Sequence, residues 1–155
     1  MAKTQTQPKR AAQPAKRTTS KVFSEAERSA MKEAIKEAKR GPRGKADGEG
    51  DVLGKIAEMP PADREIAERI HAIVKTSVPD VEPRTWYGMP AYAKGGNVIC
   101  FFKPAVKFKA RYATLGFSDK AKLDDGALWP TEFAVTKLTA DVEERIAKLV
   151  KQAAS

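Results

Sequence analysis

The side chains with the clearest potential for chemistry lie between residues 85 and 112. The stretch "TWYGMPAY" (residues 85–92) gathers aromatic and sulfur side chains around a glycine, and "VKFKARY" (residues 106–112) alternates apolar residues with cations. In a regular strand this alternation places the cations together on one face. Rings and cations that share a concave surface are typical of sites for anionic ligands. We therefore expect a ligand site formed by Tyr87, Met89, Tyr92, Lys107, Lys109 and Arg111.

Part of this cluster also fits a purely structural role. Aromatic and sulfur side chains often fill a core, and a row of cations can be the solvated face of a sheet. We expect Trp86 to be buried against the helix predicted for residues 62–77. At least one of Tyr87 and Tyr92 should keep its hydroxyl accessible. If Trp86 lies at the surface instead, the aromatic cluster is better interpreted as an exposed recognition patch.

Oxygen ligands for a hard metal ion are the second candidate chemistry. "LDDG" places two neighbouring carboxylates close to the predicted sheet, and another carboxylate follows within a few residues. Carboxylates of this kind can bind a hard cation such as Fe²⁺, whereas Asp-Asp-Gly is also common in ordinary turns. The candidate metal ligands are Asp124, Asp125 and Glu132.

Residues suited to nucleophilic or general acid–base catalysis are scarce. The chain has one histidine, His71, and one cysteine, Cys100. A lone histidine beside an apolar helix stripe is usually structural, and a thiol within "NVICFF" is expected to be buried and inert. No catalytic set can be assembled from these residues, so we expect a non-enzymatic protein.

The positive charge is concentrated in the first third of the chain. Residues 1–47 carry 13 Lys/Arg against 5 Asp/Glu, whereas residues 48–155 carry 16 against 15. Residues 1–22 hold six basic residues, no acidic ones and little that can be buried, which predicts a disordered tail. Such a tail can bind nucleic acid weakly and without specificity, or it can serve only to keep the protein in solution.

The composition favours a protein that stays in the cytoplasm. No stretch of about 18 apolar residues is available to span a membrane, and the N-terminus lacks the apolar segment of a secretory signal. A single cysteine cannot form an internal disulfide. We therefore expect no membrane partner and a reducing compartment.

Periodicity and turn signals divide the chain into four parts. After the tail, residues 23–40 predict a helix whose alanine-rich stripe favours weak docking, and the glycine-rich residues 41–51 predict a flexible linker. Residues 52–155 form the folded domain. Its helices, antiparallel strands with a glycine hairpin at residues 94–97, and final helix after Thr139 predict an α+β fold, with helices packed on an antiparallel sheet in two layers.

Several motifs of the folded domain resemble those of a known family. They are "TWYGMPAY", the glycine hairpin, "VICFF", "KFKARYATLGF" and "LDDGALWPTEFAVTKL". Over roughly residues 52–152 they resemble the YdhG-like family, small bacterial domains mostly of unknown function. The resemblance implies a compact α+β domain, and it implies iron as a candidate ligand because some members are described as frataxin-like iron chaperones. A frataxin-type acidic ridge is absent here, since the helix of residues 23–40 mixes acidic and basic residues.

The expected function is that of a non-enzymatic intracellular binding domain. Its aromatic and basic concavity would hold a small anionic ligand or a protein segment. Iron binding at the three carboxylates of residues 124–132 is the alternative that the resemblance favours. The basic tail favours a third function, that of a nucleic-acid accessory protein.

Overall fold

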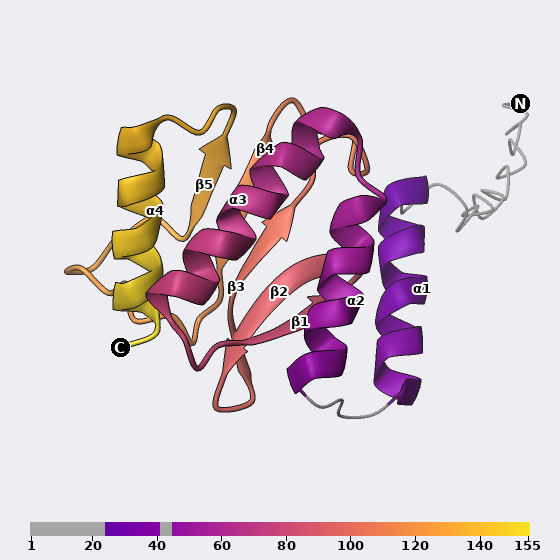
Figure 1. The fold of residues 1–155 in the computed structure, drawn as a ribbon, viewed down its shortest axis with the longest axis horizontal. Coiled ribbons are helices and arrows are strands. Elements are labelled where there is room, and N and C mark those ends of the chain that lie inside the picture. The colour runs from indigo at the N-terminus through magenta and orange to yellow at the C-terminus, as the bar shows by residue number, and fades with distance from the viewer. Residues whose placement is uncertain (1–23, 41–44) are drawn as a thin grey trace, which may run out of the picture.

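The computed structural model describes residues 24–40 and 45–155, and within them it confirms the predicted α+β fold. Four helices and a five-stranded sheet are present in these described residues (Figure 1). The order is α1 (Glu25–Arg40), α2 (Lys45–Ala57), α3 (Pro61–Ser77), β1 (Glu82–Trp86), β2 (Met89–Lys94), β3 (Asn97–Lys103), β4 (Ala113–Phe117), β5 (Glu132–Val135) and α4 (Ala140–Ala153). The predicted tail of residues 1–22 lies outside the described residues.

The sheet is an antiparallel meander in which each strand pairs with the next, in the order β1-β2-β3-β4-β5. Two-residue turns join the first three strands. Gly95 and Gly96 have φ values of 59° and 82° and close the hairpin predicted at residues 94–97, which is confirmed. Tyr87 and Gly88, with φ values of 52° and 73°, form the corresponding turn between β1 and β2. Positive φ at both positions matches the right-handed twist of the strands.

The helices cover one face of the sheet and form the core with it. In Figure 1, α3 crosses in front of the strands and α4 lies beside β5. Apolar side chains at helical spacing explain this packing: α3 buries Ala67, Ile70 and Val74, and α4 buries Ile146 and Val150.

The residues that start these helices match the sequence signals. Pro61 occupies the first turn of α3, and the side chain of Thr139 accepts a hydrogen bond from the backbone of Val142 as the N-cap of α4. The predicted final helix is therefore confirmed.

The segment predicted as a flexible linker is helical over most of its length. Helix α2 begins at Lys45, so residues 45–51 belong to it, and residues 41–44 lie outside the described residues. Glycine has a structural purpose here. A Cβ added to Gly48 would lie 2.2 Å from the carbonyl oxygen of Pro83, so α2 can approach β1 this closely only without a side chain at that position.

The segment "VKFKARY" was expected to be a strand, and this expectation is wrong. Residues 105–109 form turns, closed by backbone hydrogen bonds from Lys109 to Val106 and from Ala110 to Ala105. Pro104 has no N–H with which to continue the ladder of β3, and the Val106 amide donates to the Asp63 carboxylate instead. The alternating cations therefore do not line one face of a strand.

Helix α1 contacts the rest of the domain at its edge, beside α2 (Figure 1). Among its described side chains Ala30 is the buried one, whereas Met31 and Ile35 are 43% and 56% exposed. The sequence predicted an apolar stripe that includes both exposed residues. The helix instead turns polar side chains toward the domain, Glu33 and Glu37.

Candidate ligand-binding surface

The two faces of the sheet carry different kinds of residue. Cys100 and Phe102 of β3 point into the core, so Phe101 between them points to the opposite face. Trp86 is half-buried and belongs to that opposite face, because it is outside the core cluster and its ring contacts Phe101. The expectation that Trp86 packs against α3 is therefore wrong: the residue that β1 turns toward the core is Pro83.

Three aromatic rings form a row on this opposite face. The ring centroids of Tyr87 and Trp86 lie 5.1 Å apart, and those of Trp86 and Phe101 lie 5.2 Å apart, both in edge-to-face geometry. Phe101 extends the row over β4, where a Cβ added to Gly116 would lie 2.2 Å from the ring. The glycine thus leaves the space in which the Phe101 ring lies. At the other end of the row, Tyr87 is 41% exposed.

Cations lie along the row of rings. Lys103 shares the face of Phe101, two residues away, and its Nζ lies 5.1 Å from the ring centroid of Phe108. Lys107 approaches the same Phe108 ring at 5.6 Å. Arg84 shares the face of Trp86 in β1 and is exposed. We call Arg84, Trp86, Tyr87, Phe101, Lys103, Lys107 and Phe108 together the ring surface.

All residues of the ring surface belong to a segment of the sequence whose charged side chains are all basic. Residues 83–118 contain no Asp or Glu, and they contain six cations: Arg84, Lys94, Lys103, Lys107, Lys109 and Arg111. The near balance of charge over residues 48–155 conceals this local excess. A run of one sign next to accessible rings attracts anions and disfavours cations such as Fe²⁺.

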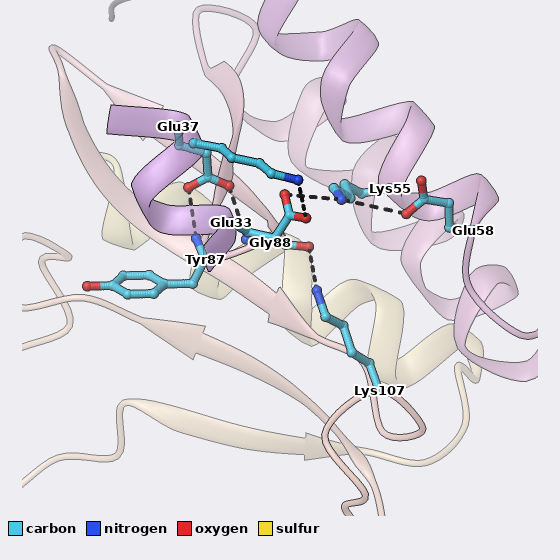
Figure 2. A network of polar contacts seen from close by, with 8 residues as sticks. Glu33, Glu37, Lys55, Glu58, Tyr87, Gly88 and Lys107 are labelled. Atoms are coloured by element: carbon cyan, nitrogen blue, oxygen red, sulfur yellow. Dashed lines mark hydrogen bonds and ion pairs between the residues drawn. The ribbon is translucent and has the colours of Figure 1, made fainter. Parts of the chain in front are cut away.

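Lys107 connects the loop after β3 to the turn between β1 and β2. Its Nζ donates a hydrogen bond to the carbonyl oxygen of Gly88 at 3.5 Å (Figure 2). Partial burial lowers the pKa of Lys107, and the positive charge of Lys55 lowers it further. The nearby carboxylates of Glu33, Glu58 and Glu37 act in the opposite direction and raise the pKa, but they offset these effects only in part.

Helix α1 contacts the same turn through Glu37. The carboxylate of Glu37 accepts hydrogen bonds from the backbone N–H groups of Tyr87 and Gly88, each at 3.0 Å (Figure 2). Tyr87 is a non-glycine residue with positive φ, a conformation that is strained for most side chains. The bidentate carboxylate helps to hold that conformation and therefore to position the Tyr87 ring.

Of the six ligand-site residues predicted from the sequence, two are buried: Tyr92 in the core, and Met89 outside the core cluster, as the strand partner of Trp86. Tyr92 is 1% exposed and Met89 is 7% exposed, so neither is available to a ligand. Tyr87 and Lys107 do belong to the ring surface. Lys109 and Arg111 are exposed in the loop after β3, with the guanidinium of Arg111 5.5 Å from the ring of Tyr112.

Tyr92 is part of a polar network that runs from the core to partly exposed side chains. Its hydroxyl lies 2.9 Å from Nδ1 of His71, and Nε2 of His71 lies 3.1 Å from Glu49, which also accepts from Lys75 at 2.8 Å. Because a carboxylate only accepts, Nε2 carries the hydrogen, and in the neutral ring Nδ1 then accepts from the Tyr92 hydroxyl. The hydrogen bonds from Lys75 and His71 lower the pKa of Glu49. The network links α2, α3 and β2.

The groups best suited to covalent chemistry are closed off by this packing. Cys100 is 1% exposed, and burial raises the pKa of its thiol to about 12. Burial likewise raises the pKa of Tyr92. The predictions of a structural histidine and of a buried cysteine are both confirmed.

The predicted metal ligands are not brought together. Asp124 lines an open cleft of about 370 Å³ next to Asp119, whereas Asp125 and Glu132 are exposed, the latter on β5. Within residues 24–40 and 45–155 the structure contains no group of three or more His, Cys, Asp or Glu side chains placed to hold a metal ion. The structure therefore gives no support to a metal site at Asp124, Asp125 and Glu132, and the chain turns at Gly126 and Ala127.

Comparison with known proteins gives no relative from which a ligand of this surface could be inferred. The chain matches no family model, and neither curated proteins nor solved structures show significant similarity to it. The resemblance to the YdhG-like family thus rests on the motifs alone. The described helices also include none that is both long and apolar enough to cross a membrane.

The ligand-site residues predicted from the sequence did not include Arg84, Phe101, Lys103 and Phe108. Two signals point to them. One is the alternation within "VICFFK", which places Phe101 and Lys103 on the face opposite to the core residues Cys100 and Phe102. The other is the run of residues 83–118 without a carboxylate.

Proposed function

We propose that this protein is a non-enzymatic intracellular binding domain for an anionic ligand that carries planar rings, the chemistry of nucleotides. The ring surface holds the ligand. The observation that supports this most directly is the row of Tyr87, Trp86 and Phe101, with centroids 5.1 and 5.2 Å apart and cations beside it.

Stacking and charge act together in this proposal. Aromatic side chains on an open sheet offer platforms for bases, and each stacked base contributes about 1–3 kcal/mol. The half-buried Trp86 and Phe101 are held by their neighbours and lose little conformational freedom on binding. Lys103 and Arg84 would neutralise phosphate groups next to the stacked rings.

Binding rather than catalysis is favoured by where the reactive side chains lie. His71 and Cys100 are buried with the core face of the sheet, on the side away from the ring surface. The charged groups of the ring surface are lysine and arginine, which attract anions. Iron delivery is not favoured, because the ring surface is cationic.

The test is direct titration of the purified protein with a fluorescently labelled oligothymidylate of about 12 nucleotides, within the size range of single-strand sites. Fluorescence anisotropy measures the dissociation constant, and a nucleoside monophosphate added as competitor separates a single-nucleotide ligand from a strand. Trp86→Ala and Phe101→Ala should each weaken binding about 5- to 150-fold, which corresponds to the 1–3 kcal/mol of one stacked base. Lys103→Ala should reduce the dependence of binding on salt.

Matched variants make the test specific. Trp129→Phe removes the other tryptophan, and Lys151→Ala removes a cation from the end of α4; neither should change the affinity. A chain without residues 1–22 should still bind, whereas a nucleic-acid accessory acting through its tail would lose binding. If Trp86→Ala binds as tightly as the parent chain, the ring surface is not the site.

A further inference from the structure

The contact between α1 and the Tyr87–Gly88 turn has the features of an occupied anion site. Consecutive backbone N–H groups in a turn form a concave pair of donors that binds anions. Tyr87 and Gly88 both have positive φ, and both N–H groups donate to one carboxylate, that of Glu37, at 3.0 Å. A side chain of the protein itself therefore shows that this turn binds an oxyanion.

A cleft with two cations lies next to the same turn. It has a volume of about 360 Å³, and its lining includes Gly88 and four charged side chains, Lys55, Lys107, Glu33 and Glu58. Glu58 pairs with Lys55 at 3.6 Å. Lys55 Nζ lies 3.4 Å from the Glu33 carboxylate. A Cβ added to Gly88 would lie 2.6 Å from Lys107 Nζ and 3.1 Å from Cγ of Glu33, so both side chains lie close to the turn (Figure 2).

The two carboxylates come from one face of a lightly attached helix. Glu33 and Glu37 are spaced i,i+4 on α1 and therefore point the same way. Helix α1 contributes no residue to the core cluster, and Met31 and Ile35 remain exposed on it. Its contact with the turn thus depends largely on charge. An anion from solution can replace the carboxylates in a contact of this kind.

We propose that the Tyr87 and Gly88 amides, together with Lys55 and Lys107, form a binding site for an external oxyanion such as a phosphate group, which α1 fills with Glu33 and Glu37 in the unliganded protein. The proposal goes beyond the function proposed above, because this site lies on the α1 side of the turn and needs none of the stacked rings. A phosphate offers more acceptor atoms and more charge than one carboxylate, so it can satisfy the amides and an ammonium group together.

The experiment follows the backbone amide resonances of Tyr87 and Gly88 during titration with inorganic phosphate at constant ionic strength, with chloride as the reference anion. In the Glu33→Ala/Glu37→Ala variant, phosphate should shift both resonances with saturation at a dissociation constant of about 1 mM. The parent chain should bind at least about tenfold more weakly, because its own carboxylates compete. Lys107→Ala added to the double variant should weaken binding at least about tenfold.

Controls separate this site from general effects of charge. Glu25→Gln removes one negative charge from the exposed first turn of α1 and should leave the parent behaviour unchanged. Lys109→Ala removes an exposed cation two residues from Lys107 and should not affect phosphate binding. Trp86→Ala in the double variant should still bind phosphate, so a failure of the ring surface as a site is distinguishable from a failure here.

The result that overturns the proposal is a shift that is non-saturating, or equal in phosphate and chloride, in the double variant. The Glu37→Gln variant repeats the test with a side chain of the same size, in case the double variant does not fold. It should bind phosphate more tightly than the parent chain. Absence of saturable binding in Glu37→Gln overturns the proposal as well.

Discussion

Phe101 and Phe102 are neighbours in β3, yet they have opposite surroundings. Phe102 has no exposed surface and packs in the core between the sheet and the helices, whereas Phe101 is half-buried against Trp86 and over Gly116. The core face also contains the hydrogen bond between His71 and Tyr92, and no buried side-chain nitrogen or oxygen of the described residues lacks a hydrogen-bond partner. The same type of residue therefore stabilises the fold on one face and remains accessible to a ligand on the other.

The largest expected difference between the faces is in stability. Phe102→Ala should lower the free energy of unfolding by about 3–5 kcal/mol, the range for deletion of a buried aromatic side chain. Phe101→Ala should cost about 1 kcal/mol, since its partial burial yields only part of the transfer free energy. Urea denaturation of both variants measures the difference. Equal losses would show that the two faces are packed alike.

Gly116→Ala tests the contact that seats the Phe101 ring. The new Cβ would lie 2.2 Å from that ring, so the ring must move, and we expect a loss of about 1–3 kcal/mol, as for other overpacked sites. The displacement should also weaken oligonucleotide binding. Gly54→Ala is the matched control, because nothing lies within 4 Å of its new Cβ. In α2 this control should be neutral or stabilising by up to about 1 kcal/mol. An unchanged stability of Gly116→Ala would contradict the described position of Phe101.

The acid stability of the core face should depend on Glu49. The hydrogen bonds from Lys75 and His71 hold its pKa below the ordinary value of 4.5. A depressed carboxylate pKa stabilises the folded state above the unfolded pKa, and this contribution is lost as the pH falls through the folded pKa. Thermal melts should therefore show the parent chain more stable than Glu49→Gln at neutral pH, with the difference shrinking below pH 4.5. Glu68→Gln, at an exposed site, is the control; a difference that is constant with pH would refute the role of Glu49.

The smallest expected effect concerns the thiol beneath the sheet. With its pKa raised to about 12 by burial, Cys100 should react with iodoacetamide at neutral pH only when the protein unfolds. Mass spectrometry of the folded protein and of the protein in urea follows this reaction. Rapid alkylation of the folded chain would mean that the core face opens readily.

The fold was predictable to a large extent because its signals are local. The apolar spacing around Ile70, the capping residue Thr139 and the glycines of residues 94–97 each specify an element from nearby residues. The strand expected at residues 106–112 failed for a non-local reason. Asp63, more than forty residues away in the sequence, accepts the hydrogen bond of the Val106 amide and stabilises a turn where alternation alone favours a strand.

The candidate site was predictable in its location but not in its members. Aromatic and basic residues around the Tyr87–Gly88 turn do lie together, yet Met89 and Tyr92 of this stretch are buried. Tyr92 was assigned to the ligand, whereas its hydroxyl pairs with His71, a contact across 21 positions that no local pattern reveals. The contribution of α1 was hidden for the same reason, since Glu37 reaches the turn from 50 positions away.

The two tryptophans of the chain allow the most direct test of the ring surface. Trp86 lies in it, and Trp129 lies in the cleft next to Asp124, so each indole N–H gives a separate resonance that reports on a separate place. In a titration with oligothymidylate, we predict that the Trp86 indole resonance shifts with saturation while that of Trp129 does not. A shift of Trp129 alone, or of neither indole at saturating oligonucleotide, would contradict the proposed function.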